Sequence, residues 1–492
     1  MRLIQKQFSL LLAALFLFTV GCKKKEEDPQ QRAQTSLSTF IPTSVDFTSV
    51  TLKGSISIVG EGGITDHGFV WGETASPDLN SVGKHSLGAK TEAGAFEHAV
   101  TGLAAGKTYH VRAYATDAQG TVYGEDKTFS TTGSPTITEF TPTEAGQGDT
   151  VTIKGTNFNA TTAETSIKFG TTAATTILSV SETEIKVVVP SGVTEGANKI
   201  TATIKGLAAA STPDFTYLGG LWTQKKDFGG SAREFAISFG IGTKGYIGLG
   251  RTDQQFDKAL SDLWEYDAAN DTWTQKASYP GGKRTAPVVF VIDDIAFVGL
   301  GLDETKAEKK DFWQYKPANN TWAQLTDFAG TYSIQGGEAA FSVGSSGFVI
   351  KSGSNELWEI SLGVWGQKNN LPFVSTKTAF VINDVAYIVA NDRKLWKYNT
   401  NNDSWTGLKS FPEAVVLSGM VINGKSYAAT GSQSNYVMWE YNPSTDTWSK
   451  KRGLSGSIKF PSYTDAFSIN SKVYVREGGF SRSSFWEFDP TK

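Results

Sequence analysis

The chain has 492 residues, a formal net charge of −3 and 19% charged residues, so it offers no basic stripe for binding nucleic acid. Glycine is frequent, at 51 residues, and aromatic residues make up 12%, which favours an extracellular, modular, all-β protein. With one cysteine the chain cannot form an internal disulfide, so its stability must come from cores large enough to supply it.

The first 21 residues predict a signal peptide. Arg2 and Lys6 make the start positive, and Phe8 to Val20 is a nearly apolar run of 13 residues, too short for a comfortable membrane span. Gly21 then precedes Cys22, the only cysteine. This order resembles a bacterial lipoprotein signal. The resemblance implies cleavage before Cys22 and a lipidated sulfur that anchors the protein in a membrane; an ordinary secretory signal is the alternative.

Residues 22–35 predict a flexible tether. Lys23 to Gln31 is charged and has no apolar side chain, so it cannot pack a core. The charges also resemble surface-export signals of some Gram-negative lipoproteins, although here the basic residues come first. We therefore expect an outer-membrane protein, anchored through Cys22 and exposed at the cell surface, with a periplasmic orientation or secretion as alternatives.

Residues 36–132 predict a β-sandwich, because runs such as Tyr109 to Ala115 alternate and no helical periodicity is present. Leu103, Gly106 and Tyr109 have a spacing that resembles the tyrosine corner of fibronectin type III domains. Residues 134–217 predict a second sandwich. There, Gly148 to Phe158 and the runs that follow resemble an IPT/TIG immunoglobulin-like domain, which implies a spacer or contact module.

Residues 218–492 predict a ring of repeats, because twelve of the thirteen tryptophans lie in this region in two interleaved series. The series are Trp264, Trp313, Trp358, Trp396, Trp439 and Trp486, and Trp222, Trp273, Trp322, Trp365, Trp405 and Trp448. Steps of roughly 38 to 51 residues, with many glycines and β-formers, indicate propeller blades. Most of these tryptophans are expected to pack between neighbouring sheets.

Each unit reads as a hairpin, a glycine stop, a Trp-x-Tyr strand such as Leu263 to Tyr266, and a turn such as Asn270 to Trp273. This pattern resembles the kelch repeat, with six units, of which the third and fourth are irregular. Leu221 to Gln224 is a fourth strand without a blade, and Trp486 to Pro490 ends a blade without a fourth strand. We expect the two to pair and close the ring. The predicted fold is therefore all-β, with two Ig-like sandwiches followed by a six-bladed kelch-type propeller.

The residues that commonly carry chemistry are scarce in the ring. All four histidines (His67, His85, His98 and His110) precede it, and it has no cysteine, so it cannot supply the ligands of kelch copper oxidases of the galactose oxidase type. We expect no metal, no cofactor and no catalytic residue. Kelch enzymes that epimerise sialic acid leave a sugar-active enzyme, an epimerase or a lyase, as an alternative.

The resemblance to kelch propellers places two sets of loops on one face, around the central channel: those between strands two and three, and those between blades. Arg233 and Arg284 stand at equivalent places in such loops. We expect them to bind an oxygen-rich ligand, unless they cap strand ends. The other candidates are Tyr332, Lys377, Tyr436 and Tyr463. The predicted function is monomeric, non-catalytic capture of an extracellular glycan or protein, with a structural or adhesion role as a further alternative.

Overall fold

The computed structural model describes residues 33–331, 339–351, 353–374, 376–413, 418–432, 435–454 and 465–492. The predicted signal peptide, Cys22 and the tether as far as residue 32 lie outside the described residues, as do Tyr332, Tyr463 and the side chain of Lys377. Within the described ranges, no helix is long and apolar enough to cross a membrane. One compact unit ends at Ser134 and a second runs from Pro135 to Lys492.

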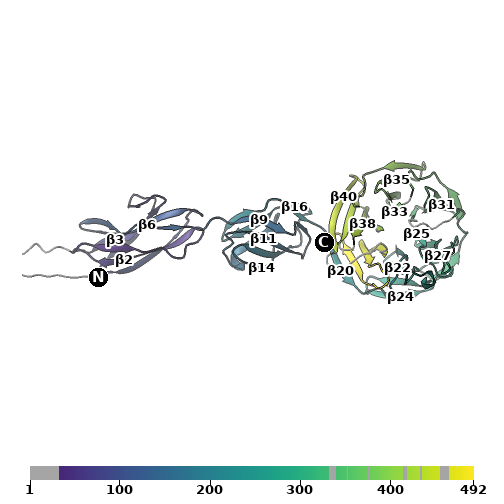
Figure 1. The fold of residues 1–492 in the computed structure, drawn as a ribbon, viewed down its shortest axis with the longest axis horizontal. Coiled ribbons are helices and arrows are strands. Elements are labelled where there is room, and N and C mark those ends of the chain that lie inside the picture. Colours follow the sequence, from purple (N-terminus) through teal and green to yellow (C-terminus); the bar gives the residue numbers. More distant parts are fainter. Residues whose placement is uncertain are drawn as a thin grey trace, which may run out of the picture. The chain divides into compact units, whose positions relative to one another are not determined.

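The first unit is a sandwich of two antiparallel sheets (Figure 1). One sheet has the order β1 (Ser36–Thr39), β2 (Ser49–Ile58), β5 (Gly94–Thr101). The other has the order β4 (Gly83–Lys90), β3 (Ile64–Gly72), β6 (Thr108–Asp117), β7 (Gly120–Tyr123), and β8 (Lys127–Ser130) also pairs with β6. Leu52, Phe69 and Val111 are completely buried between the sheets, because alternate residues of each strand face inward. The hydroxyl of Tyr109 accepts a hydrogen bond of 3.0 Å from the amide of Ala104.

The second unit begins with another immunoglobulin-like sandwich, in which Ile153, Phe169, Val187 and Phe215 are completely buried. Its sheets have the orders β14-β15-β11-β9, β13-β12-β17-β18 and β10-β19-β16. The strands are β9 (Thr136–Thr141), β10 (Glu144–Ala145), β11 (Thr150–Thr156), β12 (Thr165–Phe169), β13 (Thr172–Ala173), β14 (Ile177–Val180), β15 (Glu184–Val188), β16 (Gly196–Asn198), β17 (Ile200–Ile204), β18 (Leu207–Ala210) and β19 (Phe215–Tyr217), with the 3-10 helix η1 at Thr162–Glu164.

The rest of the second unit is a ring of six four-stranded antiparallel sheets, the blades of a propeller (Figure 1). Blades 1 to 3 are β21 (Ile237–Ile241), β22 (Lys244–Gly248), β23 (Leu263–Asp267) and β24 (Thr272–Lys276); β25 (Val288–Ile292), β26 (Ile295–Gly299), β27 (Phe312–Lys316) and β28 (Thr321–Gln324); β29 (Ala339–Val343), β30 (Ser346–Ile350), β31 (Leu357–Ser361) and β32 (Val364–Gln367). Blades 4 to 6 are β33 (Thr376–Ile382), β34 (Val385–Ala390), β35 (Leu395–Asn399) and β36 (Ser404–Gly407); β37 (Ser418–Ile422), β38 (Lys425–Ser432), β39 (Asn435–Asn442) and β40 (Thr447–Leu454); β41 (Asp465–Ile469), β42 (Lys472–Arg476), β43 (Phe485–Asp489) and β20 (Leu221–Lys225). The 3-10 helix η2 (Phe256–Lys258) lies between β22 and β23.

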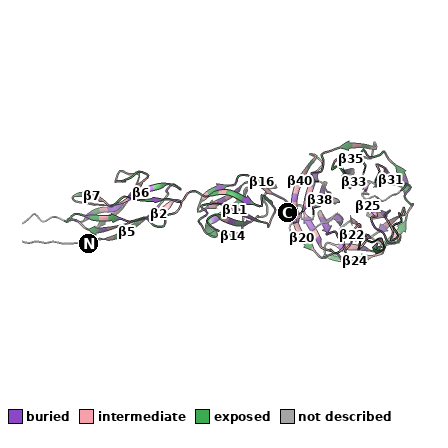
Figure 2. Ribbon diagram, viewed as in Figure 1, coloured by how far each residue is buried: buried purple, intermediate pink, exposed green. Residues whose placement is uncertain are grey.

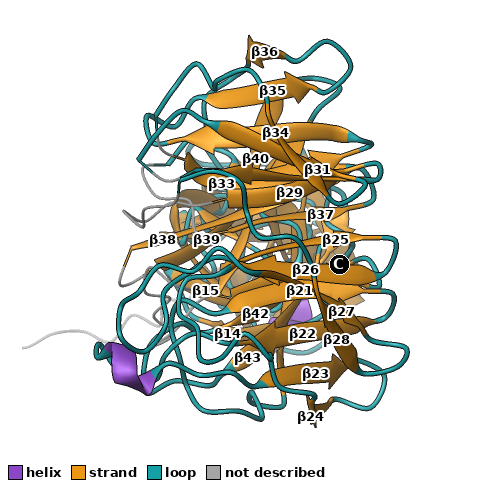
Figure 3. Cartoon of the chain, turned by 90° about the vertical axis from the view of Figure 1, so that its right-hand side faces the viewer, coloured by secondary structure: helices purple, strands orange, loops and turns teal. Residues whose placement is uncertain are grey.

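The first strands of neighbouring blades contact one another around the central channel. The turns and loops lie at the two opposite faces of the ring (Figure 3). Buried residues lie inside the sandwiches and along the inner strands of the ring (Figure 2).

The ring closes as the sequence predicts. β20, which precedes blade 1 in the chain, pairs antiparallel with β43, from Leu221 opposite Asp489 to Lys225 opposite Phe485. Blade 6 is thus built from both ends of the propeller sequence, which leaves no gap between blades 6 and 1.

In four blades, a tyrosine in the third strand holds the turn that follows it in the same conformation. The hydroxyl of Tyr266 donates to Asp271 at 2.7 Å, and Asp271 has a positive φ of 52°, a conformation that Asp and Asn tolerate better than most residues. The same bond joins Tyr315 to Asn320, Tyr398 to Asp403 and Tyr441 to Asp446. Blade 3 lacks the tyrosine, and Gly363, with φ 79°, occupies the turn.

Candidate binding face of the propeller

Arg233 and Arg284, expected from the sequence to contact a ligand, are completely buried. The two terminal nitrogens of Arg233 donate to the two carboxylate oxygens of Asp262 at 2.6 and 2.8 Å, and Nη1 also donates to the carbonyl of Leu249 at 3.0 Å. In blade 2, Arg284 repeats this arrangement with Asp311 at 2.9 and 3.2 Å. Each arginine therefore ties the loop that enters a blade to the loop before the third strand of that blade.

An indole and an aromatic ring complete each arginine pair. Trp264 Nε1 donates to Asp262 at 2.8 Å, and the guanidinium of Arg233 lies 5.0 Å from the ring of Phe228. Burial opposes the ionisation of Asp262, but the hydrogen bonds and charge of Arg233 outweigh it and hold the pKa of that carboxyl below its usual value. Neither guanidinium is exposed, so the structure favours the structural alternative for the two arginines over direct contact with a ligand.

Tyr436 is also buried, with 2% of its surface exposed. Its ring packs edge-on against Trp222, with 5.5 Å between the centroids. Tyr332 and Tyr463 lie outside the described residues, and so does the side chain of Lys377, whose backbone belongs to β33. Of the six predicted ligand residues, the three whose side chains are described are therefore buried, and the prediction for the other three lies outside the described residues.

The central channel holds a hollow of about 300 Å³ lined by the first strands of all six blades. Its walls are glycine, serine, alanine, valine, methionine and phenylalanine residues. The hydroxyl of Ser342 donates to the carbonyl of Val291 at 2.6 Å, and that of Ser238 to the carbonyl of Ala466 at 2.9 Å, so these hydroxyls tie adjacent blades together. Among the described residues that line this hollow, none carries an ionisable side chain for general acid–base chemistry.

A cluster that the sequence reasoning missed lies on the face that carries the loops between second and third strands. The guanidinium carbon of Arg251 lies 4.7 Å from the ring centroid of Phe235 and 4.6 Å from that of Phe256. Lys306 Nζ, from the corresponding loop of blade 2, lies 5.1 Å from the ring centroid of Phe256. We call these four residues the Phe256 cluster. Three loops of blades 1 and 2 thus bring aromatic rings and cations into contact.

The Phe256 cluster is held in place by its backbone. Arg251 and Glu234 exchange backbone hydrogen bonds, both of 3.0 Å, and Arg251 Nη1 donates to the carbonyl of Gln254 at 2.9 Å. Phe235 has a φ of 56°, which is strained for a bulky residue, and such strain is often retained at functional sites. Burial raises the pKa of Glu234, and the charge of Arg251 opposes this effect. Phe256 is half-buried and Lys306 is exposed, so a ligand can reach both.

One signal in the sequence could have identified this cluster. Phe256 is the only aromatic residue in the polar loop between β22 and β23. An aromatic side chain in such a loop is exposed to solvent unless it packs against a partner, so its presence there indicates a contact. The partners of Phe256 lie before β21 and in the loop after β26, so the sequence alone could not bring them together.

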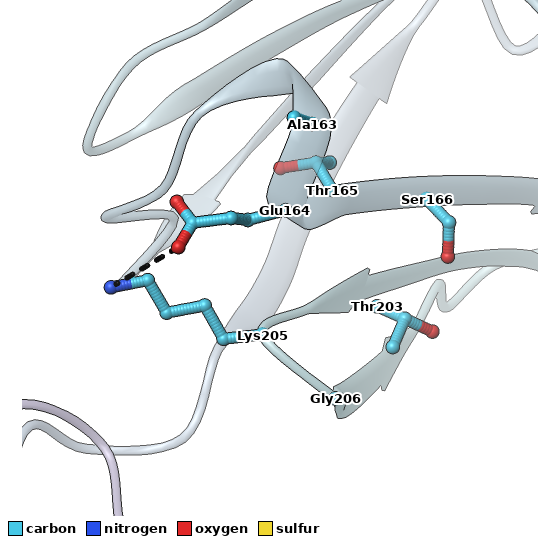
Figure 4. A pocket seen from close by; sticks show the side chains of 7 residues that line it. All are labelled: Ala163, Glu164, Thr165, Ser166, Thr203, Lys205 and Gly206. Atoms are coloured by element: carbon cyan, nitrogen blue, oxygen red, sulfur yellow. Dashed lines mark ion pairs between the residues drawn. The ribbon is translucent and has the colours of Figure 1, made fainter. Parts of the chain in front are cut away.

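A wider hollow of about 520 Å³ lies in the second sandwich, between η1, the start of β12 and the β17–β18 turn (Figure 4). Its charged groups, Glu164 and Lys205, pair with each other at 4.0 Å. The remaining side chains that line it are Ala163, Thr165, Ser166 and Thr203. These small groups give little to orient a ligand, so we do not favour this hollow as a site. Among the described residues, no group of three or more His, Cys, Asp or Glu is placed to hold a metal ion.

Residues 135–217 match the IPT/TIG domain family, which confirms the prediction for the second sandwich. No curated protein matches the chain. Among solved structures, a structural genomics protein of unknown function from Bacteroides thetaiotaomicron is similar at 14% identity and a TM-score of 0.40, over 72% of this chain and 98% of that one. A protein named YjhT is 16% identical, with a TM-score of 0.41, over 53% of this chain and 95% of its own. An auxiliary nutrient binding protein from Bacteroides thetaiotaomicron is 10% identical, with a TM-score of 0.38, over 73% and 98%. Likenesses of this size do not indicate a function.

Proposed function

We propose that this protein is a non-catalytic, lipid-anchored binding protein of the cell envelope, and that its propeller captures an extracellular glycan through the face that carries the Phe256 cluster. The observation that carries the proposal is the stack of Phe235, Arg251 and Phe256 on this face, with Lys306 beside it. A protein ligand is the second possibility for the same face.

The chemistry of the Phe256 cluster suits a sugar that carries acidic groups. The face of a phenylalanine ring packs against the apolar face of a pyranose, and a neighbouring lysine or arginine donates charge-assisted hydrogen bonds to a carboxylate or sulfate. Arg251 contacts two aromatic rings, so less side-chain entropy remains to be lost when a ligand binds.

The anchoring part of the proposal rests on the sequence. Cys22, at the end of the apolar run, is the proposed lipidation site, and residues 23–35 are the proposed tether to the first sandwich. Acyl chains on one cysteine would hold the protein at the outer membrane, since each buried methylene contributes about 0.8 kcal/mol. In this arrangement the sandwiches act as spacers, and the monomeric propeller is the part that meets the ligand at the cell surface.

A glycan array probed with the full chain, followed by calorimetry on the glycans it retains, tests the proposal. We expect binding to acidic glycans and a loss of at least about tenfold in affinity when Phe256→Ala and Lys306→Ala are combined. The matched control is Leu362→Ala, because Leu362 is 98% exposed in the β31–β32 turn, on the opposite face of the ring. Equal affinity of the cluster variant and the unmodified protein would contradict the proposed site. Turnover of a bound sugar would contradict the non-catalytic role and support an epimerase or lyase.

A further inference from the structure

Two histidines stack face to face between the two sheets of the first sandwich. The ring centroids of His85 on β4 and His98 on β5 lie 3.4 Å apart, and the ring planes differ by 6°. β4 is the edge strand of one sheet and β5 is the edge strand of the other. The histidine pair therefore bridges the sandwich at an edge where no backbone ladder joins the sheets.

Both rings lie on the core side of their strands. His85 is opposite Phe69 in the β3–β4 register, and His98 is opposite Leu52 in the β2–β5 register. Directly opposed residues of an antiparallel pair share a face, and Phe69 and Leu52 are completely buried. The two half-buried imidazoles therefore cover the edge of the hydrophobic core.

Among the described residues, no carboxylate pairs with either imidazole ring. Within the described residues, neither His85 nor His98 has a hydrogen-bond or ion-pair partner. The other ionisable groups on β2, β3, β4 and β5 have other surroundings. His67 lies 2.6 Å from the carbonyl of Gly88, Asp66 accepts hydrogen bonds from Ser86 and Tyr114, and Lys53 pairs with Glu97 at 3.7 Å. Lys84 is exposed, and Lys90 lies at the far end of β4 opposite Ile64.

Protonation changes the interaction between the two rings. A neutral imidazole stacks on another ring, but two imidazolium ions at this separation repel each other with nothing between them to screen the charge. Burial, and then the charge of His85, lower the pKa of His98 from its ordinary value of 6.5. A bridging metal ion does not suit this arrangement, because an ion bound in the plane of one ring cannot lie in the parallel plane of the other.

We infer that His85 and His98 form a pH-sensitive latch that holds the β4 and β5 edges of the sandwich together while at least one ring is neutral, and releases them when both rings are protonated. The pKa of His98 is lower in the folded state than in the unfolded state, so the folded state binds fewer protons. The stabilisation of the folded sandwich is therefore complete above the ordinary histidine pKa, and it is lost as the pH falls through the lowered pKa of His98. The latch is independent of the proposed ligand-binding role.

Amide hydrogen exchange of the full chain at pH 7.5 and pH 5.0, corrected for intrinsic rates and read by mass spectrometry, tests the latch. We expect opening of residues 83–101 to increase roughly eightfold or more at the lower pH, the Boltzmann factor for two unit charges at this separation in the dielectric of water. Peptides from β6 should change much less. His98→Phe keeps a stacking partner and removes one charge, so it should abolish the pH dependence; His85→Phe should do the same.

His110→Phe is the matched control, because His110 pairs with Asp126 at 2.9 Å and is not part of the stacked pair. This variant should keep the pH dependence of β4 and β5. Equal exchange of residues 83–101 at the two pH values would overturn the inference, as would a pH dependence that persists in both phenylalanine variants. Loss of the effect on adding a chelator would show that a metal ion, and not repulsion, links the rings.

Discussion

Replacing Arg284 by alanine should lower the free energy of unfolding of the propeller, whether or not a ligand is bound. Arg284 is completely buried and donates to Asp311 at 2.9 and 3.2 Å, to the carbonyl of Leu300 at 2.8 Å and to that of Gly281 at 2.6 Å. Removing one partner of a buried ion pair costs about 3–5 kcal/mol, because the other charge stays buried without compensation. The Asp311 side chain keeps 18% of its surface exposed, so we expect a loss near the lower limit, about 3 kcal/mol.

Urea denaturation of the full chain followed by tryptophan fluorescence measures this loss, because every tryptophan except Trp71 lies in the propeller. The urea midpoint of the propeller transition should fall for Arg284→Ala. For Lys283→Ala, at an exposed neighbouring position, the free energy of unfolding should change by less than about 0.5 kcal/mol. Asp311→Ala combined with Arg284→Ala should cost less than the sum of the two single changes. An unchanged midpoint together with weaker ligand binding would refute this reasoning and return Arg284 to the role of a ligand group.

Three further predictions concern two tryptophans of the ring, the two buried arginine–aspartate pairs and Cys22. Trp313→Phe removes the donor of a 2.9 Å bond to Asp311, whereas the buried indole nitrogen of Trp396 has no hydrogen-bond partner among the described residues. Trp313→Phe should therefore cost about 1–2 kcal/mol more than Trp396→Phe in the urea assay. Hydrogen bonds and charge from Arg233 and Arg284 outweigh burial and lower the pKa values of Asp262 and Asp311. The contribution of these two pairs to stability is therefore present above the usual aspartate pKa and is lost only as the pH falls through the lowered values. Thermal melts of the unmodified protein and of Arg284→Ala should accordingly differ by the same amount at pH 7.5 and at pH 5. Cys22→Ser should release the protein from the membrane fraction, and its retention there would contradict lipid anchoring.

The parts of the fold that could be predicted are those that depend on the regular spacing of residues along the chain. The tryptophan series defines blades because each blade repeats the same four strands, and the pairing of β20 with β43 follows from one incomplete blade at each end. The surroundings of Arg233 could not be predicted in this way. Its partner Asp262 stands 29 positions later, beyond a loop of variable length, so the sequence could not distinguish a buried pair from an exposed cation.

The same limit applies to the Phe256 cluster and the histidine latch. Arg251 and Lys306 come from different blades, and His85 and His98 come from different sheets, so neither arrangement leaves a periodic signal. Contacts between loops and between sheet edges depend on how the layers pack, which spacing along the chain does not encode.

Hydrogen exchange of the full chain, with and without a glycan selected on the array, tests directly whether the Phe256 cluster binds the ligand. We expect protection of residues 251–260 and 302–310, the loops that carry Arg251, Phe256 and Lys306, and none in the β31–β32 turn. Protection confined to the second sandwich, or to the turns on the opposite face of the ring, would contradict binding at the Phe256 cluster.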